Sequence, residues 1–315
     1  MAWTAADLPD QTGRTVLITG ATAGIGLEAA RMLAQRGARV LLGARDRGRG
    51  DAARARVLGA APRASVDVLD VNLADLASVA AACDRLAAEG TVLDVLVNNA
   101  GVMATPLRRT ADGFELQLGT NHVGHFALTG RLLPLLEAAP EPRVVTVSSG
   151  AHRMAAADLE DLDATASYRP WAAYGRSKLA NLLFTFELDR RARAAGSTLS
   201  AVACHPGFTA TNLQTAGPAM AGQRLRGRLI GGVTTLLGQS AAAGALPTVY
   251  AATAPDARSG DYIGPDGPGE MRGGPTHVEA SAAAQDPTLA AQLWTWSEEV
   301  TGVAFAFAGV PEREG

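Results

Sequence analysis

Short hydrophobic runs rich in β-branched residues alternate with longer alanine-rich segments along most of the chain. The longer segments place hydrophobic residues at helical spacing, and the short runs predict strands. These runs are Thr15–Thr19, Arg39–Leu42, Val66–Val71, Val92–Val97, Arg143–Val147 and Thr198–Ala203. A strand followed by a helix, repeated in this way, predicts an α/β fold in which a parallel sheet carries helices on both faces. We expect residues 1–315 to form a single domain of this kind.

A glycine-rich loop follows the first predicted strand, at the edge where parallel sheets bind ligands. It reads TGATAGIG, from Thr19 to Gly26, and leads into a helix predicted from about Ile25 to Gly37. Its three glycines allow a tight turn and a close approach to a pyrophosphate, which would lie at the positive end of the helix dipole. The spacing G-x-x-x-G-x-G differs from the commoner dinucleotide spacing and from the P-loop. Glycines can serve a turn alone, but this position favours a nucleotide loop in a Rossmann-type, doubly wound sheet.

The second predicted strand runs into Gly43 and Ala44, with Arg45 directly after them. NAD enzymes usually carry an acid about 20 residues beyond the glycine loop, whereas an arginine there accommodates the 2′-phosphate of NADP. The cation at Arg45 therefore favours NADP over NAD. The alternative is that Arg45 is a solvated arginine at a helix start and that Asp46 binds the ribose.

Composition and charge argue against several other functions. The net charge of −3 gives no basic surface for nucleic acid. Cys83 and Cys204 lie far apart without metal-ligand spacing, which argues against a structural zinc site and favours a reducing cytoplasm. No window reaches the roughly 18 apolar residues of a membrane-spanning helix. We therefore expect a cytoplasmic protein with no membrane span and no nucleic-acid partner.

Lys178 is the only lysine among the 28 basic residues. It follows Tyr174 by four positions, so on a helix the two side chains project from one face, one turn apart. A free phenol has a pKa of about 10, and a neighbouring ammonium would lower that pKa towards the range of a general base. Lysine supplies a compact charge, whereas the planar fork of arginine is bulkier and differently aimed. Such a pair is common on exposed helices, but beside a nucleotide loop it indicates catalysis.

Six motifs occur in an order that resembles the short-chain dehydrogenase/reductase family. They are TGATAGIG, NNAG at Asn98–Gly101, NHVGHF at Asn121–Phe126, VSS ending at Ser149, Tyr174-x-x-x-Lys178, and HPG at His205–Gly207. The phrases NHVGHF, YGRSKLANLLF and HPGFTATNL, with 25 residues from Ser149 to Tyr174, are most similar to the retinol-dehydrogenase-like branch. That branch also resembles protochlorophyllide reductases. The resemblance covers roughly residues 12 to 265.

The resemblance implies four catalytic residues. Tyr174 would exchange a proton with the carbonyl or alcohol oxygen, Lys178 would hold the phenol and the nicotinamide ribose, and Ser149 would donate to the developing alkoxide. Asn121 would order a water that relays protons towards the lysine. Ser149 is otherwise a helix cap or turn former, with Ser148 as the neighbouring candidate. Asn121 is otherwise a buried amide with its own backbone partners.

The resemblance also implies cofactor contacts at the carboxyl ends of the strands. Small residues after Val97 would let the backbone approach adenosine, while Asn98 braces the sheet. Asn72 stands where the family usually has an aspartate that touches the adenine amine, and the contact is open between Asn72 and Asp70. Ala23 offers only backbone contacts to the phosphates. The full set is Gly20, Thr22, Ala23, Gly24, Ile25, Gly26, Arg45, Asp70, Asn72, Leu73, Asn98, Ala100, Gly101, Tyr174, Lys178, Pro206, Gly207 and Thr211.

Two stretches are expected to form the walls of the substrate site. Residues 208–244 are long, apolar and interrupted by glycines, and they correspond to the lid of the family. The interval between Ser149 and Tyr174 contains Tyr168 and Trp171 and supplies the second wall. Both stretches predict a mostly apolar substrate.

The C-terminal part and a pair of histidines receive non-catalytic interpretations. Asp286 followed by Pro287 predicts the cap of a helix within the C-terminal helix and tail of residues 280–315, whose tryptophans we assign to core or subunit contacts. His122 and His125 lack a third ligand, so we expect packing and hydrogen bonding and no metal site.

The sequence thus predicts an NADP(H)-dependent oxidoreductase that transfers a hydride between the nicotinamide and a carbonyl or alcohol group of a mostly apolar small molecule. Carbonyl reduction is the expected direction, because NADPH pools favour it. One alternative is a sugar-nucleotide epimerase or dehydratase on the same scaffold, which the glycine spacing disfavours. The other is a non-catalytic regulator that senses NADP, which the Tyr174 and Lys178 pair disfavours. The resemblance allows a homodimer or a homotetramer.

Overall fold

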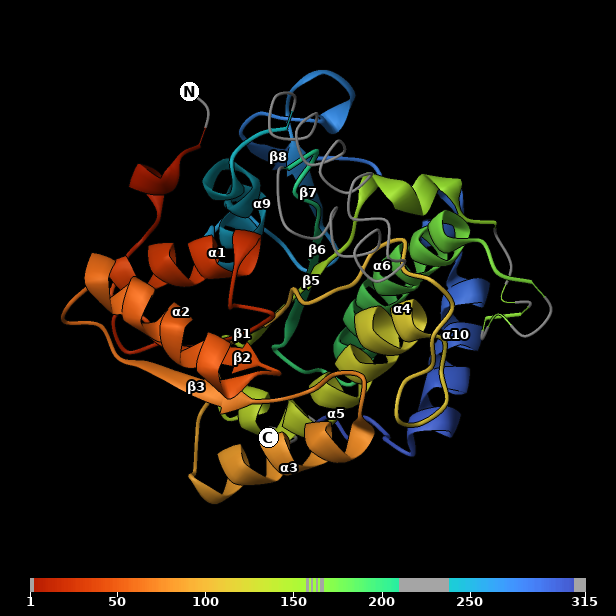
Figure 1. The fold of residues 1–315 in the computed structure, drawn as a ribbon, viewed down its shortest axis with the longest axis horizontal. Helices are drawn as coiled ribbons and strands as arrows, with labels where there is room; N and C mark the ends of the chain where they lie inside the picture. Colours follow the sequence, from red (N-terminus) through yellow and green to blue (C-terminus); the bar gives the residue numbers. More distant parts are fainter. Residues whose placement is uncertain are drawn as a thin grey trace, which may run out of the picture.

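One sheet of eight strands forms the centre of the part of the chain that the structure describes (Figure 1). This computed structural model describes residues 3–156, 159, 161, 162, 164, 167–209 and 238–308. The strand order is β3-β2-β1-β4-β5-β6-β7-β8, parallel from β3 to β7, with β8 antiparallel. The strands are β1 Thr15–Thr19, β2 Arg39–Ala44, β3 Val66–Asp70, β4 Val95–Asn98, β5 Arg143–Val147, β6 Ser200–Cys204, β7 Tyr262–Pro265 and β8 Pro275–His277.

The first six strands confirm the sequence prediction, with small shifts at their ends. β4 begins at Val95 rather than Val92, because the amide of Leu93 donates to the carbonyl of Leu135 and turns away from the sheet. β7 and β8 were not predicted. Both lie in a stretch dense in glycine and proline, and β7 meets β6 at only two residue pairs. The doubly wound α/β fold itself is as predicted.

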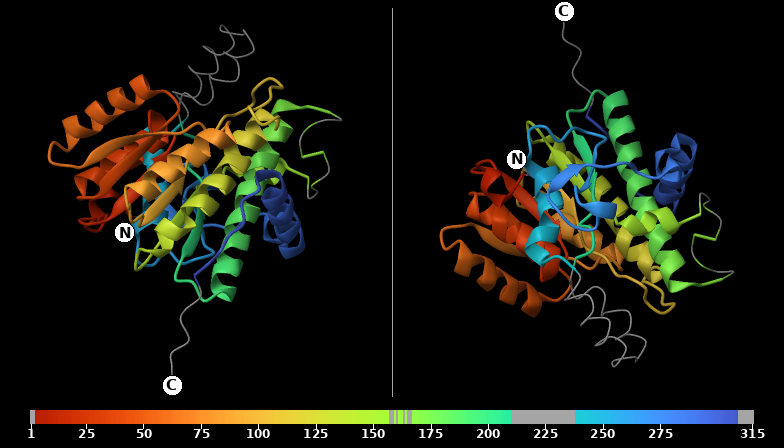
Figure 2. Two further views of the ribbon diagram at one scale, coloured as in Figure 1. Left: turned by 90° about the horizontal axis from the view of Figure 1, so that it is seen from below. Right: turned by 90° about the horizontal axis from the view of Figure 1, so that it is seen from above.

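Helices cover both faces of the sheet (Figure 2). Side chains alternate along each strand, so Val16 and Ile18 pack towards α1, α2 and α9, whereas Leu17 packs towards α3, α5 and α6. No helix in the described residues is both long and apolar enough to cross a membrane. The helices are α1 Gly24–Gln35, α2 Arg47–Ala60, α3 Leu76–Ala88, α4 Leu116–Leu118, α5 Gly124–Glu137, α6 Pro170–Ala194, α9 Ala241–Thr253 and α10 Pro287–Thr301.

The C-terminal helix α10 is held to the sheet layers by an aromatic cluster. Trp294 is 1% exposed and stacks on Phe184 of α6, with ring centroids 5.9 Å apart. It also meets Phe126 of α5 at 5.2 Å and Phe305 at 4.5 Å, and the guanidinium of Arg191 lies 4.6 Å from its ring. The prediction of a helix capped by the residue before Pro287 is confirmed, and Trp294 is a core residue.

Replacing Trp294 should test this cluster. Trp294→Ala is expected to lower the free energy of unfolding by about 3–5 kcal/mol, because it leaves a large cavity among three aromatic rings. Trp296→Ala serves as a control on the same helix, since that ring is only partly buried and meets Phe114 edge-on. Urea denaturation measures both values, and an equal loss for the two variants would contradict the assignment.

Candidate functional site

A cleft of about 840 Å³ lies at the carboxyl ends of the parallel strands. It gathers the residues that follow β1 to β6, as expected for a doubly wound sheet. The predicted site residues that line it are Gly20, Thr22, Ala23, Gly24, Ile25, Gly26, Arg45, Asn72, Leu73, Ala100, Gly101, Ser149, Tyr174, Lys178, Pro206 and Gly207. The predicted residue Thr211 lies outside the described residues, as do residues 210–237 of the expected lid.

The glycine loop lets two strand ends come together. Gly20 has φ +66°, and a Cβ there would lie 2.8 Å from the Cα of Ala100. A Cβ on Gly26 would lie 2.5 Å from the side-chain nitrogen of Asn99. Any larger residue at either position would therefore push the ends of β1 and β4 apart.

Helix α1 begins at Gly24 directly beneath the loop. Its N-cap is Ala23, which has no side chain able to accept from the first-turn amides. Those N–H groups therefore keep their capacity for an anion at the positive end of the helix dipole. An uncapped helix start beside the glycines that line the cleft fits a dinucleotide phosphate.

Two arginines line the cleft beyond β2. Arg45 and Arg49 make no side-chain hydrogen bond or ion pair with the described residues, while Arg47 between them pairs with Asp51 at 3.2 Å. Asp46 accepts from the amide of Arg49 at 2.8 Å and caps α2. Asp46 also lines the cleft, so Arg45 and Arg49 face this end of it together with one acid.

Asp70 and Asn72, the two candidates for the adenine contact at the end of β3, differ in whether their side chains face the cleft. Asn72 and Leu73 line the cleft. Asp70 is exposed, lies outside the cleft and forms an ion pair with Arg47 at 3.3 Å. Asp70 therefore lies apart from the cleft, with its side chain directed towards α2, and the adenine contact stays a prediction for Asn72.

Asn98 has the sheet-bracing role that the resemblance implied. It is fully buried and donates to the hydroxyl of Thr129 at 3.0 Å, so it braces the sheet and does not line the cleft. Its neighbour Asn99 lines the cleft and donates to the carbonyl of Thr19 at 2.8 Å. The Thr19 hydroxyl in turn accepts from the amides of Asn99 and Ala100, which fixes the backbone that approaches Gly20.

Tyr174 and Lys178 lie one turn apart on α6, as predicted. Both are buried, at 4% and 3% exposure, yet both line the cleft. The Lys178 ammonium donates to the carbonyl of Val147, the last residue of β5, at 2.9 Å. It lies 5.9 Å from the centre of the Tyr174 ring.

The two serines after β5 have different tasks. Ser148 is buried, and its hydroxyl donates to the carbonyl of Lys178 at 2.8 Å, which ties α6 to β5. Ser149 lines the cleft beside Tyr174, and its hydroxyl is near enough to act on the pKa of the phenol. Its hydroxyl also accepts from the amide of Ala151 at 3.2 Å, so the capping role considered from sequence is present as well.

Burial dominates the ionisation of the pair. It raises the pKa of Tyr174 to about 12, although the nearby Ser149 hydroxyl acts in the opposite direction. The prediction of a lowered phenol pKa is wrong, because the ammonium is directed at Val147 and does not offset burial. Burial also lowers the pKa of Lys178 to about 8. Near pH 7 the phenol is protonated and most of the lysine is charged.

Asn121 is a buried amide with its own backbone partners, which is the alternative considered from sequence. It lies in a π-helical turn, Gly119–Val123, and its side chain is fully buried. The amide oxygen accepts from the Val102 amide at 2.8 Å, and the amide nitrogen donates to the Val102 carbonyl and to the Ser177 hydroxyl. The side chain does not line the cleft. It positions the backbone after Gly101, beside Lys178.

His122 and His125 are packing and hydrogen-bonding residues, as predicted. His122 Nε2 lies 2.8 Å from the Ser297 hydroxyl, and burial lowers its pKa to about 3. His125 Nε2 lies 2.8 Å from the Thr19 hydroxyl, and burial lowers its pKa to about 4. Within the described ranges no three His, Cys, Asp or Glu side chains are grouped to hold a metal ion.

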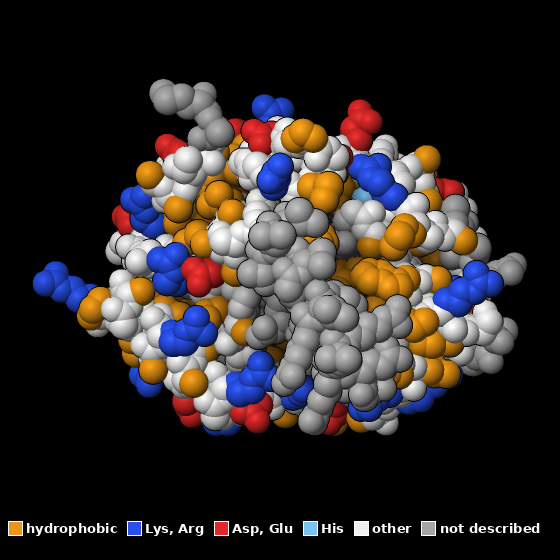
Figure 3. Space-filling view, turned by 45° about the horizontal axis from the view of Figure 1, so that its top comes forward, with side chains coloured by type: hydrophobic (Ala, Val, Ile, Leu, Met, Phe, Trp, Pro, Cys, Tyr) orange, Lys and Arg blue, Asp and Glu red, His pale blue; other side chains and the backbone are white. Residues whose placement is uncertain are grey.

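Several apolar side chains line the cleft, together with Arg108. Trp171 lies there, 55% exposed, and meets the Tyr174 ring edge-on at 6.1 Å. Met103 and Phe208 line the same cleft. Tyr168 is not a wall residue, because its hydroxyl donates to the carbonyl of Thr105 at 2.6 Å and stays outside the cleft. On the face shown in Figure 3, hydrophobic side chains are exposed in several places, and Lys and Arg side chains are scattered among them.

Sequence reasoning missed several residues of the site. Arg49 and Asn99 each stand next to or near a predicted residue, and the repeated Asn in NNAG was a usable signal for Asn99. His152, Arg153 and Glu270 carried no signal, because they come together only through the loop between β7 and β8.

Comparisons with known proteins agree with this geometry. The family model described as short chain dehydrogenase matches residues 14–221. Retinol dehydrogenase 14 from Mus musculus is 39% identical over 303 residues, which cover 92% of this chain and 86% of that protein. A solved structure of a protein from Mycobacterium Paratuberculosis, described as uncharacterized, is 43% identical with a TM-score of 0.79, covering 98% of this chain and 100% of that one. A Beutenbergia cavernae structure with bound NADP, described as an NAD(P)-dependent gluconate 5-dehydrogenase, is 26% identical with a TM-score of 0.60, covering 80% and 95%.

These findings, with the strand order, define an oxidoreductase with a Rossmann-type fold: the chain belongs to the short-chain dehydrogenase/reductase family. Within that family it falls in the retinol-dehydrogenase-like branch, as the motifs predicted. Enzymes of the family bind nicotinamide cofactors.

The buried ammonium gives a testable pH dependence of stability. The pKa of Lys178 falls from 10.5 to about 8 on folding, so below pH 8 the folded protein bears the cost of a buried charge, and this cost disappears as the pH approaches 10.5. Relative to Lys178→Met, wild type should therefore gain up to roughly 3 kcal/mol between pH 7 and pH 10. Urea denaturation measures the free energy of unfolding of both proteins at each pH. The difference between the two values cancels the titration of other groups. A difference that is flat with pH would contradict the shift.

Proposed function

We propose that the protein is an NADP(H)-dependent oxidoreductase in which the bound nicotinamide supplies or accepts a hydride at a carbonyl or alcohol carbon of a mostly apolar substrate. The observation that carries the proposal is that Tyr174, Ser149 and Lys178 line one cleft, which begins with the glycine loop. Gly20, Gly24 and Gly26 would admit the pyrophosphate, with the uncapped first turn of α1 beneath it.

Tyr174 acts as the general acid in carbonyl reduction. Its raised pKa keeps the proton in place at neutral pH, so the phenol can donate to the substrate oxygen as that oxygen gains negative charge. The Ser149 hydroxyl stabilises the same developing charge and then the phenolate. Lys178 holds a positive charge nearby and, through Val147, keeps α6 in register with the strand that presents Ser149. A protonated phenol favours reduction over oxidation.

NADP is the proposed cofactor because of the charge beyond β2. Arg45 and Arg49 face the cleft where a 2′-phosphate would lie, and Asp46 is engaged as the cap of α2. Asn72 and Leu73 lie at the adenine end. The similar Beutenbergia cavernae structure contains NADP, which supports the same choice.

The proposed substrate is a small apolar carbonyl compound or alcohol, since Trp171, Met103 and Phe208 line the cleft near Tyr174. The name of the mouse relative, retinol dehydrogenase 14, supports an apolar alcohol or aldehyde. A cytoplasmic location stays part of the proposal, supported by two buried free cysteines.

The catalytic assignment is tested by Tyr174→Phe. This variant should bind NADPH as wild type does but lose about 10²- to 10⁴-fold in carbonyl reduction, because only the proton donor is removed. NADPH absorbance with a panel of apolar carbonyls measures the rate. Tyr250→Phe is the matched control. Tyr250 lies on α9, away from the cleft, and its hydroxyl donates to the Asp256 carboxylate at 2.7 Å. Full activity in Tyr174→Phe would overturn the assignment, and binding without turnover by wild type would favour the NADP-sensing regulator.

Cofactor preference is tested at Arg45. Arg45→Ala should weaken NADPH binding about tenfold or more and leave NADH binding within about twofold, because only NADPH carries the 2′-phosphate. Arg47→Ala is the control, since its guanidinium pairs with Asp51 and Asp70. Fluorescence titration gives the dissociation constants. Equal weakening of both cofactors by Arg45→Ala would remove the claim.

A further inference from the structure

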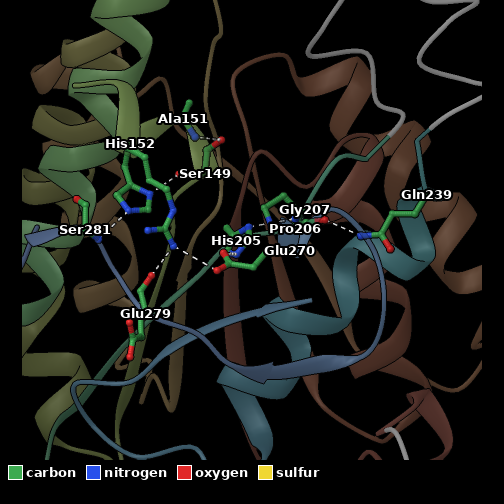
Figure 4. Close-up of polar contacts among 11 residues, drawn as sticks. Ser149, Ala151, His152, His205, Pro206, Gly207, Gln239, Glu270, Glu279 and Ser281 are labelled. Carbon is green, nitrogen blue, oxygen red and sulfur yellow. Dashed lines mark hydrogen bonds and ion pairs between the residues drawn. The ribbon is translucent and has the colours of Figure 1, made fainter. Parts of the chain in front are cut away.

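The loop between β7 and β8 contacts both sides of the catalytic end of the cleft (Figure 4). One side is the 3-10 helix Gly150–Met154, which follows Ser149. The other is the turn His205–Gly207, which follows β6. These two segments are more than 50 residues apart in sequence, and neither donates a side-chain hydrogen bond to the other among the described contacts. The strands before them are already joined, since the Ser148 amide donates to the carbonyl of Cys204 at 2.7 Å, and the loop adds a second connection beyond the strand ends.

Glu270 makes the joining contacts with its two carboxylate oxygens. Oε1 lies 3.2 Å from a guanidinium nitrogen of Arg153, and Oε2 lies 3.0 Å from Nε2 of His205. Arg153 donates in addition to the carbonyl of Glu279 at 2.6 Å, so it is held in place towards the carboxylate. The Glu270 side chain is about 29% exposed, which leaves the ion pair partly shielded from water.

His205 is neutral in this contact. Burial lowers its pKa to about 4, and Nδ1 accepts from the Gly207 amide at 3.3 Å, which leaves the proton on Nε2. The approach of Nε2 to Glu270 is close, but its angle is outside hydrogen-bond geometry, so the contact is electrostatic. The negative charge of Glu270 is therefore balanced mainly by Arg153.

The backbone of the loop is fitted to the turn. Glu270 has φ +56°, a left-handed conformation that non-glycine residues seldom adopt and that persists where the surroundings enforce it. The amide of Phe208 donates to the carbonyl of Met271 at 2.7 Å, and a Cβ on Gly207 would lie 2.5 Å from the same oxygen. The turn and the loop thus have no room to shift independently.

The serine side is held by the same segment of chain. His152 Nδ1 donates to the carbonyl of Ser149 at 2.7 Å, and its Nε2 accepts from the amide of Ser281 at 3.1 Å. Arg153 is the next residue in the 3-10 helix. A contact between Arg153 and Glu270 therefore acts on the backbone of Ser149 as well as on the turn.

We propose that Glu270 is a positioning residue that ties the helix after Ser149 to the turn His205–Gly207 and thereby sets the width of the cleft at its catalytic end. This inference rests on the proposed function, since Pro206 and Gly207 are assigned to the cofactor there. Its consequence is specific: loss of the carboxylate should weaken NADPH binding more than it slows the chemical step at saturating cofactor.

Two variants and a matched control test the proposal in the full chain. Glu270→Gln keeps the shape but removes the charge, and Glu270→Gly removes the side chain while suiting the left-handed backbone. Both should bind NADPH about three- to tenfold more weakly and raise its KM, with kcat within about twofold of wild type. Glu270→Gly should also keep or raise the melting temperature, so weaker binding cannot be ascribed to unfolding. Glu279→Gln is the control, because only its carbonyl, and not its carboxylate, contacts Arg153.

Arg153→Met removes the same ion pair from the other side. The double variant Glu270→Gln/Arg153→Met should bind NADPH no more weakly than the weaker single variant, which is the signature of a pair that acts together. Wild-type affinity in Glu270→Gln, or additive losses in the double variant, would overturn the inference while leaving the proposed function intact. Absence of NADPH binding by wild type would overturn the proposed function itself.

Discussion

The catalytic end of the molecule depends on one buried hydrogen bond, from the ammonium of Lys178 to the last carbonyl of β5. A charged group that is 3% exposed needs such a partner, and it finds one only if α6 lies across the end of the strand. A second hydrogen bond, from the Ser148 hydroxyl to the backbone carbonyl of Lys178, also links α6 to the end of β5. Tyr174, one turn earlier, then has no other place than beside Ser149. The free-energy cost of burying the Lys178 ammonium is thus a consequence of the arrangement that forms the site.

The cofactor end follows a different constraint, which is the shortage of space between strand ends. Gly20 and Ala100 are so close that their backbones touch, and Thr19 satisfies the amides of both Asn99 and Ala100 with one hydroxyl. His125 completes this arrangement by contacting the same hydroxyl, so the π-helical turn that bears Asn121 is tied to β1. Small residues provide the approach, and a buried polar network keeps it in one geometry.

The sequence predicted the sheet well where β-branched residues cluster, and it predicted site residues that directly follow such strands. It failed where the role of a residue depends on the direction of its side chain or on its burial in the folded chain. Asp70 and Asn72 are two residues apart, but only Asn72 and Leu73 turn into the cleft, because Asp70 is drawn to Arg47. The direction of the Tyr174 pKa followed from burial, which a four-residue spacing does not reveal. β7, β8 and Glu270 lie in a glycine- and proline-rich stretch whose order comes from packing on β6 and the turn after it.

The position of the lone lysine has a consequence for protein chemistry. Since all other Lys and Arg positions in this sequence are arginine, reagents that acylate or cross-link amines find one side-chain target, and that target lines the cleft. With a pKa of about 8, a useful fraction of this amine is nucleophilic under mild conditions. Acylation of Lys178 would therefore report directly on access to the cleft, because no other side-chain amine reacts with the same reagent and only the chain terminus competes.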